Sequence, residues 1–302
     1  MKRTKLSAGY LIVDWGTTNF RVFHMSNDDK LLKKQELPLG LLHITDGNFA
    51  KALENVLADW LRSYKKLPIL MAGMVGSVTG WFNVDYVETN ASKAKLIATA
   101  HSFTLPWGAP ATIIPGVNHK NNEGSFDVMR GEEVQVFGLA KLVNKSLFNA
   151  VLPGTHSKHV RVVNSEISEL SSFMTGELFS ILSEHSILGK GLPKQEKDKN
   201  TFILGVKAGQ TNRLMNTLFT VRTHQLFNKV NRAHVKEYLS GLLIGNELKN
   251  LSFSHTFLVG GSELCDNYKV ACDILSIEST YYSGDDCFLA GMIELNKVIN
   301  NA

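Results

Sequence analysis

The stretch LIVDWGTTNFRVF, residues 11–23, decides the fold of this chain. Three aliphatic residues lead into Asp14, a turn-like segment 15–19 follows, and FRVF then resumes an alternating pattern. Glycine and small polar residues are typical of tight turns, and flanking alternating runs predict a β-hairpin. A carboxylate among apolar residues is costly unless it is paired, hydrogen-bonded or bound to a metal. Asp14 is therefore a candidate functional residue, although an ordinary hairpin turn explains the same stretch.

Length and composition favour a two-domain globular protein. The chain has 302 residues, about twice an average domain, with 44% hydrophobic and 20% charged residues. The net charge of +4 is spread out, and the dense runs at 30–34 and 194–200 lack interleaved aromatic residues, so nucleic acid is not an expected partner. Cys265, Cys272 and Cys287 lack CxxC spacing and are expected to be free thiols in a reducing compartment.

The N-terminal segment does not predict export. Its apolar run is four residues long and ends at Asp14, which is too short for a signal peptide. No stretch approaches the length needed to span a bilayer, so we expect a cytoplasmic protein without a membrane partner. The sequence leaves the oligomeric state open and is compatible with a homo-oligomer.

The first half alternates strands and helices. Helical spacing over 49–64, with Asp46 or Asn48 as the N-cap, is followed by Pro68 and an apolar run at 69–73. The order strand, helix, strand predicts an α/β sheet. A further short strand is expected at 111–116, and a helix over 131–143 that carries acidic residues in its first turn.

A second stretch, AVLPGTHSKHVRVV at 150–163, resembles the first. Gly154-Thr155-His156-Ser157 matches Gly16-Thr17-Thr18-Asn19, each between an apolar run and an alternating strand. Self-similarity half a chain apart predicts two related α/β halves that each begin with a hairpin, with coincidence between two Gly-Thr turns as the alternative.

The second half is expected to continue with helices and one strand. A helix over 175–188 has Thr175 as its predicted cap, and a Lys-rich loop follows over 189–200. Glycines destabilise a helix, so Gly241 and Gly245 in the helix expected over 234–248 indicate a closely packed neighbouring helix. A strand at 256–261 and a last helix over 286–299 complete the prediction.

Several classes of enzyme are excluded because the sequence lacks their motifs. It contains no GxxxxGK[ST] motif, no protein-kinase signature, no GxSxG and no HExxH. Backbone N–H groups in glycine-rich turns form anion-binding concavities. Two such turns facing each other across a cleft could hold a triphosphate, with Asp14 binding Mg²⁺ directly or through water. A metal ion would then explain why Asp14 tolerates its apolar setting.

At this point the sequence resembles a known group of proteins. The hairpin pair, LVGGSEL at 258–264 and the terminal helix look like the signature of the actin/hexokinase/Hsp70 ATPase superfamily. More specific blocks resemble the 2-dehydro-3-deoxygalactonokinase family, and together they cover nearly the whole chain. These blocks are DWGTTN, MAGMVGSVTGW, DVMRGEEVQVFG, LPGTHSKHV, FMTGELFSIL and SGLLIGNEL.

The resemblance implies a fold and an activity. The fold is α/β, with two related ribonuclease-H-like domains and a cleft between them. Residues 1–148 would carry the first phosphate motif and most sugar contacts, and residues 149–302 the second phosphate and adenosine motifs. The activity is ATP-dependent phosphorylation of the 6-hydroxyl of 2-dehydro-3-deoxy-D-galactonate, a step of galactonate breakdown, with ATP and Mg²⁺ as cofactors.

The resemblance also implies residue roles on the sugar side. Related sugar kinases carry an Asp shortly before the first connecting helix, which makes Asp127 the expected general base, with Glu132 as the alternative. Arg130 would pair with the substrate carboxylate, or would instead balance the acidic residues beside it. Gly76 and Ser77 lie in a glycine-rich stretch that can approach a ligand closely, so both are expected sugar contacts.

The resemblance likewise implies the contacts on the nucleotide side, with the phosphate contacts in the two hairpins and the adenosine contacts in LVGGSEL. The expected phosphate contacts are Gly16, Thr17, Thr18, Asn19, Gly154, Thr155, His156, Ser157 and Lys158, and the expected adenosine contacts are Gly260 and Gly261. Lys158 could instead face solvent, and Glu177 is either a substrate contact or a favourable first-turn charge. Many superfamily members have an acidic residue where this chain has Leu152-Pro153, which leaves Asp14 as the single expected acidic metal ligand.

Several alternative functions stay open. The substrate could be a related ketodeoxy acid such as 2-dehydro-3-deoxygluconate, because the galacto and gluco acids differ in configuration at C4 and the sequence does not distinguish them. A phosphohydrolase would use water in place of the sugar hydroxyl. An ATP-dependent switch without catalysis would need additional partner-binding segments, for which 302 residues leave little room.

Overall fold

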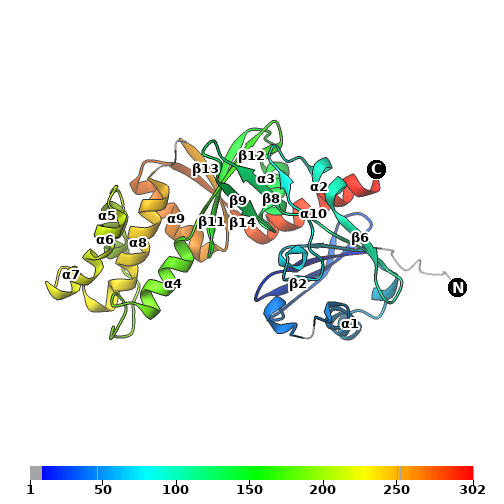
Figure 1. The fold of residues 1–302 in the computed structure, drawn as a ribbon, viewed down its shortest axis with the longest axis horizontal. Helices are drawn as coiled ribbons and strands as arrows, with labels where there is room; N and C mark the ends of the chain where they lie inside the picture. The colour runs from blue at the N-terminus through cyan, green and yellow to red at the C-terminus, as the bar shows by residue number, and fades with distance from the viewer. Residues whose placement is uncertain (1–8, 46, 250, 252–253, 302) are drawn as a thin grey trace. The chain divides into compact units, whose positions relative to one another are not determined.

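The computed structural model describes residues 9–45, 47–249, 251 and 254–301. The chain divides into two compact units. The first unit comprises Met1–Leu147, Val162–Leu170 and Asp285–Ala302, and the second comprises Phe148–Arg161 and Ser171–Gly284. Strands and helices occur in both (Figure 1), which confirms the predicted α/β class.

The first unit is built on a six-stranded mixed sheet in the order β3-β2-β1-β4-β7-β6. β1 pairs antiparallel with β2, with Asp14 opposite Arg21, so the predicted hairpin is confirmed. β1 also pairs parallel with β4, which confirms the strand predicted after Pro68. The strands are β1 Gly9–Trp15, β2 Phe20–Ser26, β3 Leu31–Leu37, β4 Ile69–Ala72, β6 His101–Thr104 and β7 Pro110–Ile113.

A three-stranded sheet and helices complete the first unit. The sheet has the order β5-β8-β9, with β5 at Val87–Glu88, β8 at Val117–Lys120 and β9 at Phe126–Met129. The helices are α1 Phe49–Trp60, α2 Lys93–Thr99, α3 Glu132–Val143 and α10 Gly284–Asn300. α10 begins one residue before the last segment of this unit, which starts at Asp285. Asn48 caps α1 by accepting a hydrogen bond from the Lys51 N–H, as predicted; Asp46 lies outside the described residues.

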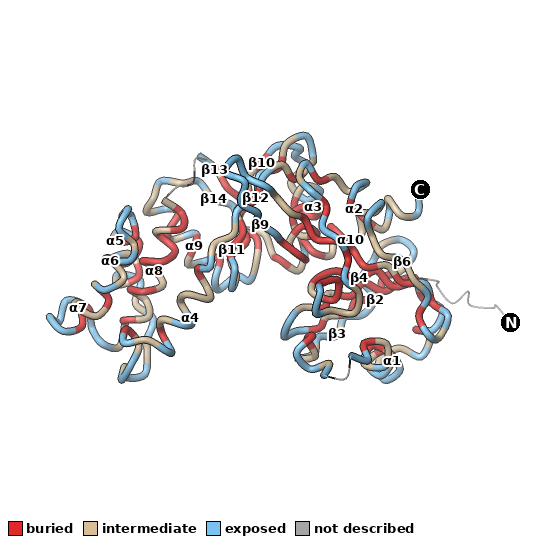
Figure 2. Tube along the Cα trace, in the orientation of Figure 1, coloured by how far each residue is buried: buried red, intermediate tan, exposed pale blue. Residues whose placement is uncertain are grey.

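Apolar side chains on β1 anchor the core of the first unit. Leu11, Val13 and Trp15 are fully buried together with Leu53 and Leu57 of α1. The neighbouring strand β4 is buried along its length (Figure 2). α3 and α10 touch at their backbones, since a Cβ added at Gly138 would lie 1.7 Å from the carbonyl oxygen of Cys287. The sheet thus fixes the Asp14 turn, and α3 begins beside it.

The second unit repeats the topology of the first. Its sheet has the order β12-β11-β10-β13-β14, in which β13 pairs parallel with both β10 and β14. β10 and β11 are neighbours joined by residues 153–156, so the second predicted hairpin is confirmed. In both sheets three consecutive strands are followed by two strands parallel to the first of them, β4 and β7 in the first sheet and β13 and β14 in the second, which supports two related halves. β6 is an additional edge strand, antiparallel to β7. The strands are β10 Phe148–Leu152, β11 Ser157–Val163, β12 Glu166–Phe173, β13 His255–Gly260 and β14 Glu278–Ser283. Residues 162–163 of β11 and 166–170 of β12 are counted with the first unit.

A helical layer makes up the rest of the second unit (Figure 1). The helices are α4 Thr175–His185, α5 Lys199–Ala208, α6 Leu214–Leu218, α7 Thr220–Leu226, α8 Val235–Leu248 and α9 Ser262–Ile274. α5 and α8 pack through glycines, because a Cβ added at Gly241 would lie 2.1 Å from the carbonyl oxygen of Phe202 and one at Gly245 would lie 2.4 Å from that of Val206. The predicted close helix packing is therefore confirmed.

This packing predicts that Gly241→Ala destabilises the protein. Alanine favours a helix over glycine by about 1 kcal/mol, but its methyl group would overlap the Phe202 backbone, and overpacking costs about 1–3 kcal/mol. We expect urea denaturation to show a lower free energy of unfolding. Lys207→Ala on the exposed side of α5 is the matched control and should change it by less than about 0.5 kcal/mol. Equal stability of Gly241→Ala and the parent chain would contradict the close packing.

Some elements differ from prediction. Thr175 was expected to cap α4, but it is the first residue of the helix, and its hydroxyl donates to the buried Glu247. The predicted loop over 189–200 ends in α5, which Asp198 caps through the Thr201 N–H. The helices α2, α5, α6, α7 and α9 and the strands β3, β5, β6, β8, β9, β12 and β14 were not predicted.

Two further expectations concern chemistry. The cysteines are free and buried, as expected. Among the residues that the structure describes, no helix combines the length and apolar character needed to cross a membrane.

Candidate functional site

A small pocket in the first unit lies beside the first hairpin turn. We call it the Asp14 pocket; its volume is about 120 Å³. It brings together Asp14, Gly16, Arg130 and Glu132, four residues to which the sequence assigned roles. The remaining lining residues are Gly73, Met74, Gly131, Gln135 and Phe288.

Asp14 is held by an ion pair across the hairpin. The Arg21 Nε donates to Asp14 Oδ2 at 2.9 Å, and the same guanidinium pairs with Asp285 at the start of α10. Burial raises the pKa of Asp14, and Arg21 acts in the opposite direction. Arg21 thus provides a second way to balance the charge of this half-buried carboxylate, and Mg²⁺ binding at Asp14 stays a prediction. The strand alternation after the turn places position 21 opposite position 14, which is the signal that could have revealed the pair.

Two glycines let the backbone approach Asp14. Gly73 has φ +94°, and a Cβ there would lie 2.9 Å from the Trp15 carbonyl oxygen and 3.2 Å from Asp14 Oδ1. Gly131 has φ +108°, and its Cβ would lie 3.4 Å from Gly73. A positive φ strongly favours glycine. The end of β4 and the start of α3 therefore meet at the Asp14 pocket.

The first turn of α3 presents two carboxylates in different environments. Glu132 lines the Asp14 pocket, and its Oε2 accepts from the Arg130 N–H at 3.0 Å. Glu133 is fully buried, and its Oε2 accepts from the Gly131 N–H at 2.7 Å. Burial, aided by the adjacent Glu132, raises the pKa of Glu133 to about 8. Glu133 thus stabilises the turn from inside, whereas Glu132 faces a space that a ligand can enter.

Arg130 is buried, and its guanidinium group has N–H donors that make no hydrogen bond among the described residues. Its Nη2 donates to the Val84 carbonyl at 2.8 Å, and its guanidinium carbon lies 4.3 Å from the ring centre of Tyr86. Its Nε and Nη1 have no hydrogen-bond partner within the described part of the chain. Gly76 lies directly beside it, since a Cβ there would be 2.9 Å from Nη1. A buried guanidinium with unused donors is suited to a carboxylate ligand.

The other predicted sugar-side residues lie apart from this pocket. Asp127 is half-buried on β9, opposite His119 of β8, and does not line the Asp14 pocket. Ser77 is buried, with its hydroxyl 3.2 Å from that of Thr79.

The first hairpin turn is stabilised by backbone hydrogen bonds to the segment 40–42. The carbonyl groups of Gly16, Thr17 and Thr18 accept hydrogen bonds from the backbone N–H groups of residues 40–42. Thr17, Thr18 and Asn19 are exposed. The turn therefore uses its carbonyl groups internally and presents polar side chains outward.

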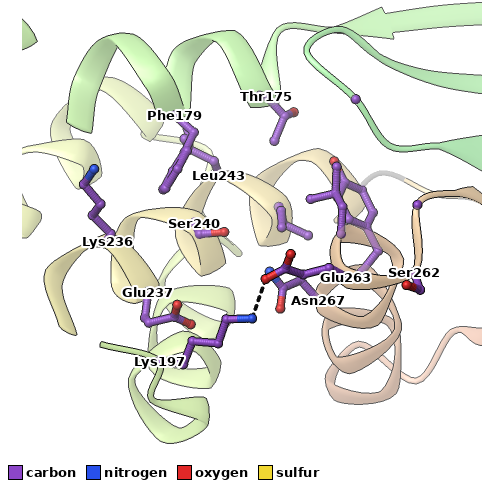
Figure 3. Close-up of a pocket in the computed structure, with 16 residues that line it drawn as sticks. Thr175, Phe179, Lys197, Lys236, Glu237, Ser240, Leu243, Ser262, Glu263 and Asn267 are labelled. Carbon is purple, nitrogen blue, oxygen red and sulfur yellow. Dashed lines mark hydrogen bonds and ion pairs between the residues drawn. The ribbon is translucent and has the colours of Figure 1, made fainter. Parts of the chain in front are cut away.

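A larger pocket of about 600 Å³ lies in the second unit, beside the second hairpin turn (Figure 3). We call it the Gly154 pocket. It brings together Gly154 of the predicted phosphate motif and Gly261 of the predicted adenosine motif, while Gly260 lies just beside them at the end of β13. Phe179 and Leu243 provide apolar walls, and Lys197 and Glu263 form an ion pair at 2.5 Å. The other lining residues are Thr175, Gly176, Lys236, Glu237, Ser240, Ile244, Ser262, Leu264, Asn267 and Tyr268.

The start of α4 packs directly on the second turn. A Cβ added at Gly176 would lie 2.4 Å from the Gly154 carbonyl oxygen, and the Glu177 N–H donates to the Thr155 carbonyl at 3.0 Å. The Glu177 carboxylate also contacts His156 Nε2. The turn and the helix start thus form one wall of the Gly154 pocket.

The next two residues of the motif point inward. Ser157 is fully buried and donates to Glu247, and Lys158 is buried with its Nζ donating to Ser172 at 2.7 Å. The alternative that Lys158 faces solvent is therefore wrong. Glu247 was not singled out from the sequence, although it is the one charged residue in the block SGLLIGNEL, which was the available signal.

Comparisons with known proteins agree with one another. The model of the 2-keto-3-deoxy-galactonokinase family matches residues 14–295. The 2-dehydro-3-deoxygalactonokinase of Escherichia coli (strain K12) is 34% identical, over 98% of this chain and 100% of that protein. DgoK1 of Rhizobium meliloti (strain 1021), described by the same enzyme name, is 30% identical over 96% of this chain and 97% of its own length. A crystal structure from Sinorhizobium meliloti, assigned as the same enzyme, covers 96% of this chain and 99% of its own chain with a TM-score of 0.88 and 30% identity.

Proposed function

We propose, since this chain belongs to the 2-keto-3-deoxy-galactonokinase family, that it transfers the terminal phosphoryl group of ATP to the 6-hydroxyl of 2-dehydro-3-deoxy-D-galactonate. The observation that carries the proposal is the family match over residues 14–295. Phosphoryl transfer depends mainly on positioning and on neutralising negative charge. The roles below assign these tasks to residues of the two pockets.

We assign the nucleoside part of ATP to the Gly154 pocket. A volume of about 600 Å³ lies within the usual range for small-ligand sites. Phe179 and Leu243 would contact the base, and Gly260 and Gly261 would allow close approach of the adenosine. The phosphates would contact the backbone of residues 154–156, because turns of this kind direct N–H groups at anions. The contacts expected from residues 16–19 stay a prediction.

We assign Mg²⁺ to Asp14. Within the described residues, no group of three or more His, Cys, Asp or Glu side chains could hold a metal ion by itself. This composition fits Mg²⁺, which usually takes one or two carboxylates and completes its coordination with water and phosphate oxygens. Bound Mg²⁺ would supply positive charge beside the ATP phosphates while the terminal phosphoryl group is transferred.

We assign the general base to Glu132. Its carboxylate would accept the proton of the 6-hydroxyl while that oxygen bonds to the γ-phosphorus and the bond to the leaving ADP oxygen breaks. The support is its place in the Asp14 pocket, whereas Asp127 does not line that pocket. Asp127 is the alternative base.

We assign the substrate carboxylate to Arg130, with Gly76 and Ser77 on the sugar side. The unused Nε and Nη1 donors and the lack of a side chain at Gly76 support this role. Glu177 contacts His156 at the second turn, so we infer that it supports that turn and does not contact the sugar acid.

The test is a coupled assay of ADP release with the two C4 epimers, 2-dehydro-3-deoxy-D-galactonate and 2-dehydro-3-deoxy-D-gluconate, with and without Mg²⁺. We expect turnover that requires Mg²⁺, is stimulated by the galacto acid and is weaker with the gluco acid. Equal turnover with both epimers would contradict the galacto assignment. Turnover without any sugar acid would instead identify a phosphohydrolase or an ATP-dependent switch.

A further inference from the structure

The second unit contains a buried carboxylate that receives hydrogen bonds from three other elements. Glu247 of α8 is 4% exposed. Ser157 Oγ and His159 Nε2, both on β11, lie 2.7 and 2.8 Å from its Oε1. The Tyr268 hydroxyl of α9 lies 2.6 Å from Oε2, and the Thr175 hydroxyl at the start of α4 donates to the same oxygen.

This arrangement satisfies a group that would otherwise be costly to bury. An unpaired buried carboxylate loses its hydration, so it is retained only where several donors replace water. Four donors do so here, and burial followed by the proximity of Glu247 raises the pKa of Tyr268 well above its usual value, which keeps that hydroxyl a donor. Glu247 is thus the common acceptor that joins β11, α4, α8 and α9.

The cluster lies directly behind the Gly154 pocket. Thr175 and Tyr268 line the pocket while their hydroxyls reach back to Glu247, which does not line it. Ser157 is the first residue after the turn at 153–156. The hairpin turn and the start of α4 together form one wall of the Gly154 pocket, and both are therefore connected by hydrogen bonds to the same carboxylate.

We propose that Glu247 is a positioning residue for nucleotide binding, which fixes the second hairpin turn and the start of α4 in the geometry that the ATP phosphates and ribose require. This inference rests on the assignment of ATP to the Gly154 pocket. Glu247 touches no substrate itself. It acts through Ser157, Thr175 and Tyr268, and a shift of about 1 Å in such a wall is enough to reduce binding or rate by up to about 100-fold.

The test compares Glu247→Gln, Tyr268→Phe and Glu294→Gln. Glu247→Gln keeps the size of the side chain but removes the charge and turns one oxygen acceptor into an amide donor. Tyr268→Phe removes one of the four donors and leaves the other contacts in place, so it stays informative if the first variant folds poorly. Glu294→Gln is the control, because Glu294 is a carboxylate in ion pairs with Lys93 and Lys297 of the first unit.

The readouts are the Kd for ATP, titrated without sugar acid, the KM values for both substrates, and the melting temperature. We expect Glu247→Gln to raise the Kd and KM for ATP about tenfold, the equivalent of one charge-assisted hydrogen bond. Tyr268→Phe should give a smaller increase, and the KM for the sugar acid should change less than about twofold in both. The control should lower the melting temperature without changing the affinity for ATP.

Two outcomes would overturn the inference. One is an unchanged Kd for ATP in Glu247→Gln despite a lower melting temperature, which would identify a purely structural cluster. The other is an equal loss of affinity for ATP and for the sugar acid. Failure of the proposed function would appear differently, as a parent protein that binds ATP normally but phosphorylates neither epimer, and the ATP titration would still decide the role of Glu247.

Discussion

Glu132→Gln is expected to reduce kcat by about 10²–10⁴-fold, the usual contribution of a general base. Glutamine cannot accept the proton of the 6-hydroxyl, but its amide oxygen can still accept from the Arg130 N–H, so the start of α3 should stay intact. The Kd for ATP should change less than about threefold, because the nucleoside is assigned to the other unit. Single-turnover phosphorylation measured beside an ATP titration separates these effects.

Asp127→Asn is the matched comparison. It makes the same chemical change five residues earlier, at a half-buried position on β9 that does not line the Asp14 pocket. We expect its kcat to stay within about tenfold of the parent value, since it would act only through the β8–β9 sheet. The reverse pattern, with Asp127→Asn inactive and Glu132→Gln active, would make Asp127 the base and would contradict the assignment drawn from the pocket.

Much of the fold near the two turns was predictable, because the signals there are local. Glycine and small polar residues between alternating runs specify a hairpin, and both hairpins are present. The Asn48 cap and the close packing at Gly241 and Gly245 also follow from the chemistry of single residues. The helices α5, α6 and α7 were missed because they are only 10, 5 and 7 residues long, shorter than the window of about 11–18 residues in which a helical period is recognised.

The site itself depended on contacts between distant positions. Asp14 was identified as unusual, but its balance by Arg21 and the link to Asp285, 264 residues from Arg21, need the folded chain. Thr175 was assigned as a cap because Thr commonly caps helices. Its hydroxyl instead serves Glu247, 72 residues away. A sequence pattern identifies polar or charged side chains whose burial is energetically unfavourable. Only the folded structure shows which partners stabilise each of them.

Arg130→Met is expected to raise the KM for the sugar acid by about 10- to 100-fold, the loss of a charge-assisted hydrogen bond in a buried site. Methionine keeps apolar contact with Tyr86 but offers no donor to Val84 or to a carboxylate. The KM for ATP should change little. Because the Val84 hydrogen bond is also lost, the melting temperature must be measured as well. Arg130→Lys keeps the positive charge but lacks the planar fork of the guanidinium, so its KM for the sugar acid should lie between those of the parent and of Arg130→Met.

The decisive experiment changes the ligand together with the protein. The substrate amide, in which the carboxylate becomes a neutral carboxamide, should be used far less efficiently than the acid by the parent enzyme. If Arg130 binds the carboxylate, Arg130→Met should lose most of this preference, so that kcat/KM values for acid and amide converge. A merely structural role would lower both values in parallel and keep their ratio. Retention of the full preference in Arg130→Met would place the carboxylate elsewhere, and the unused Nε and Nη1 donors would then need another explanation.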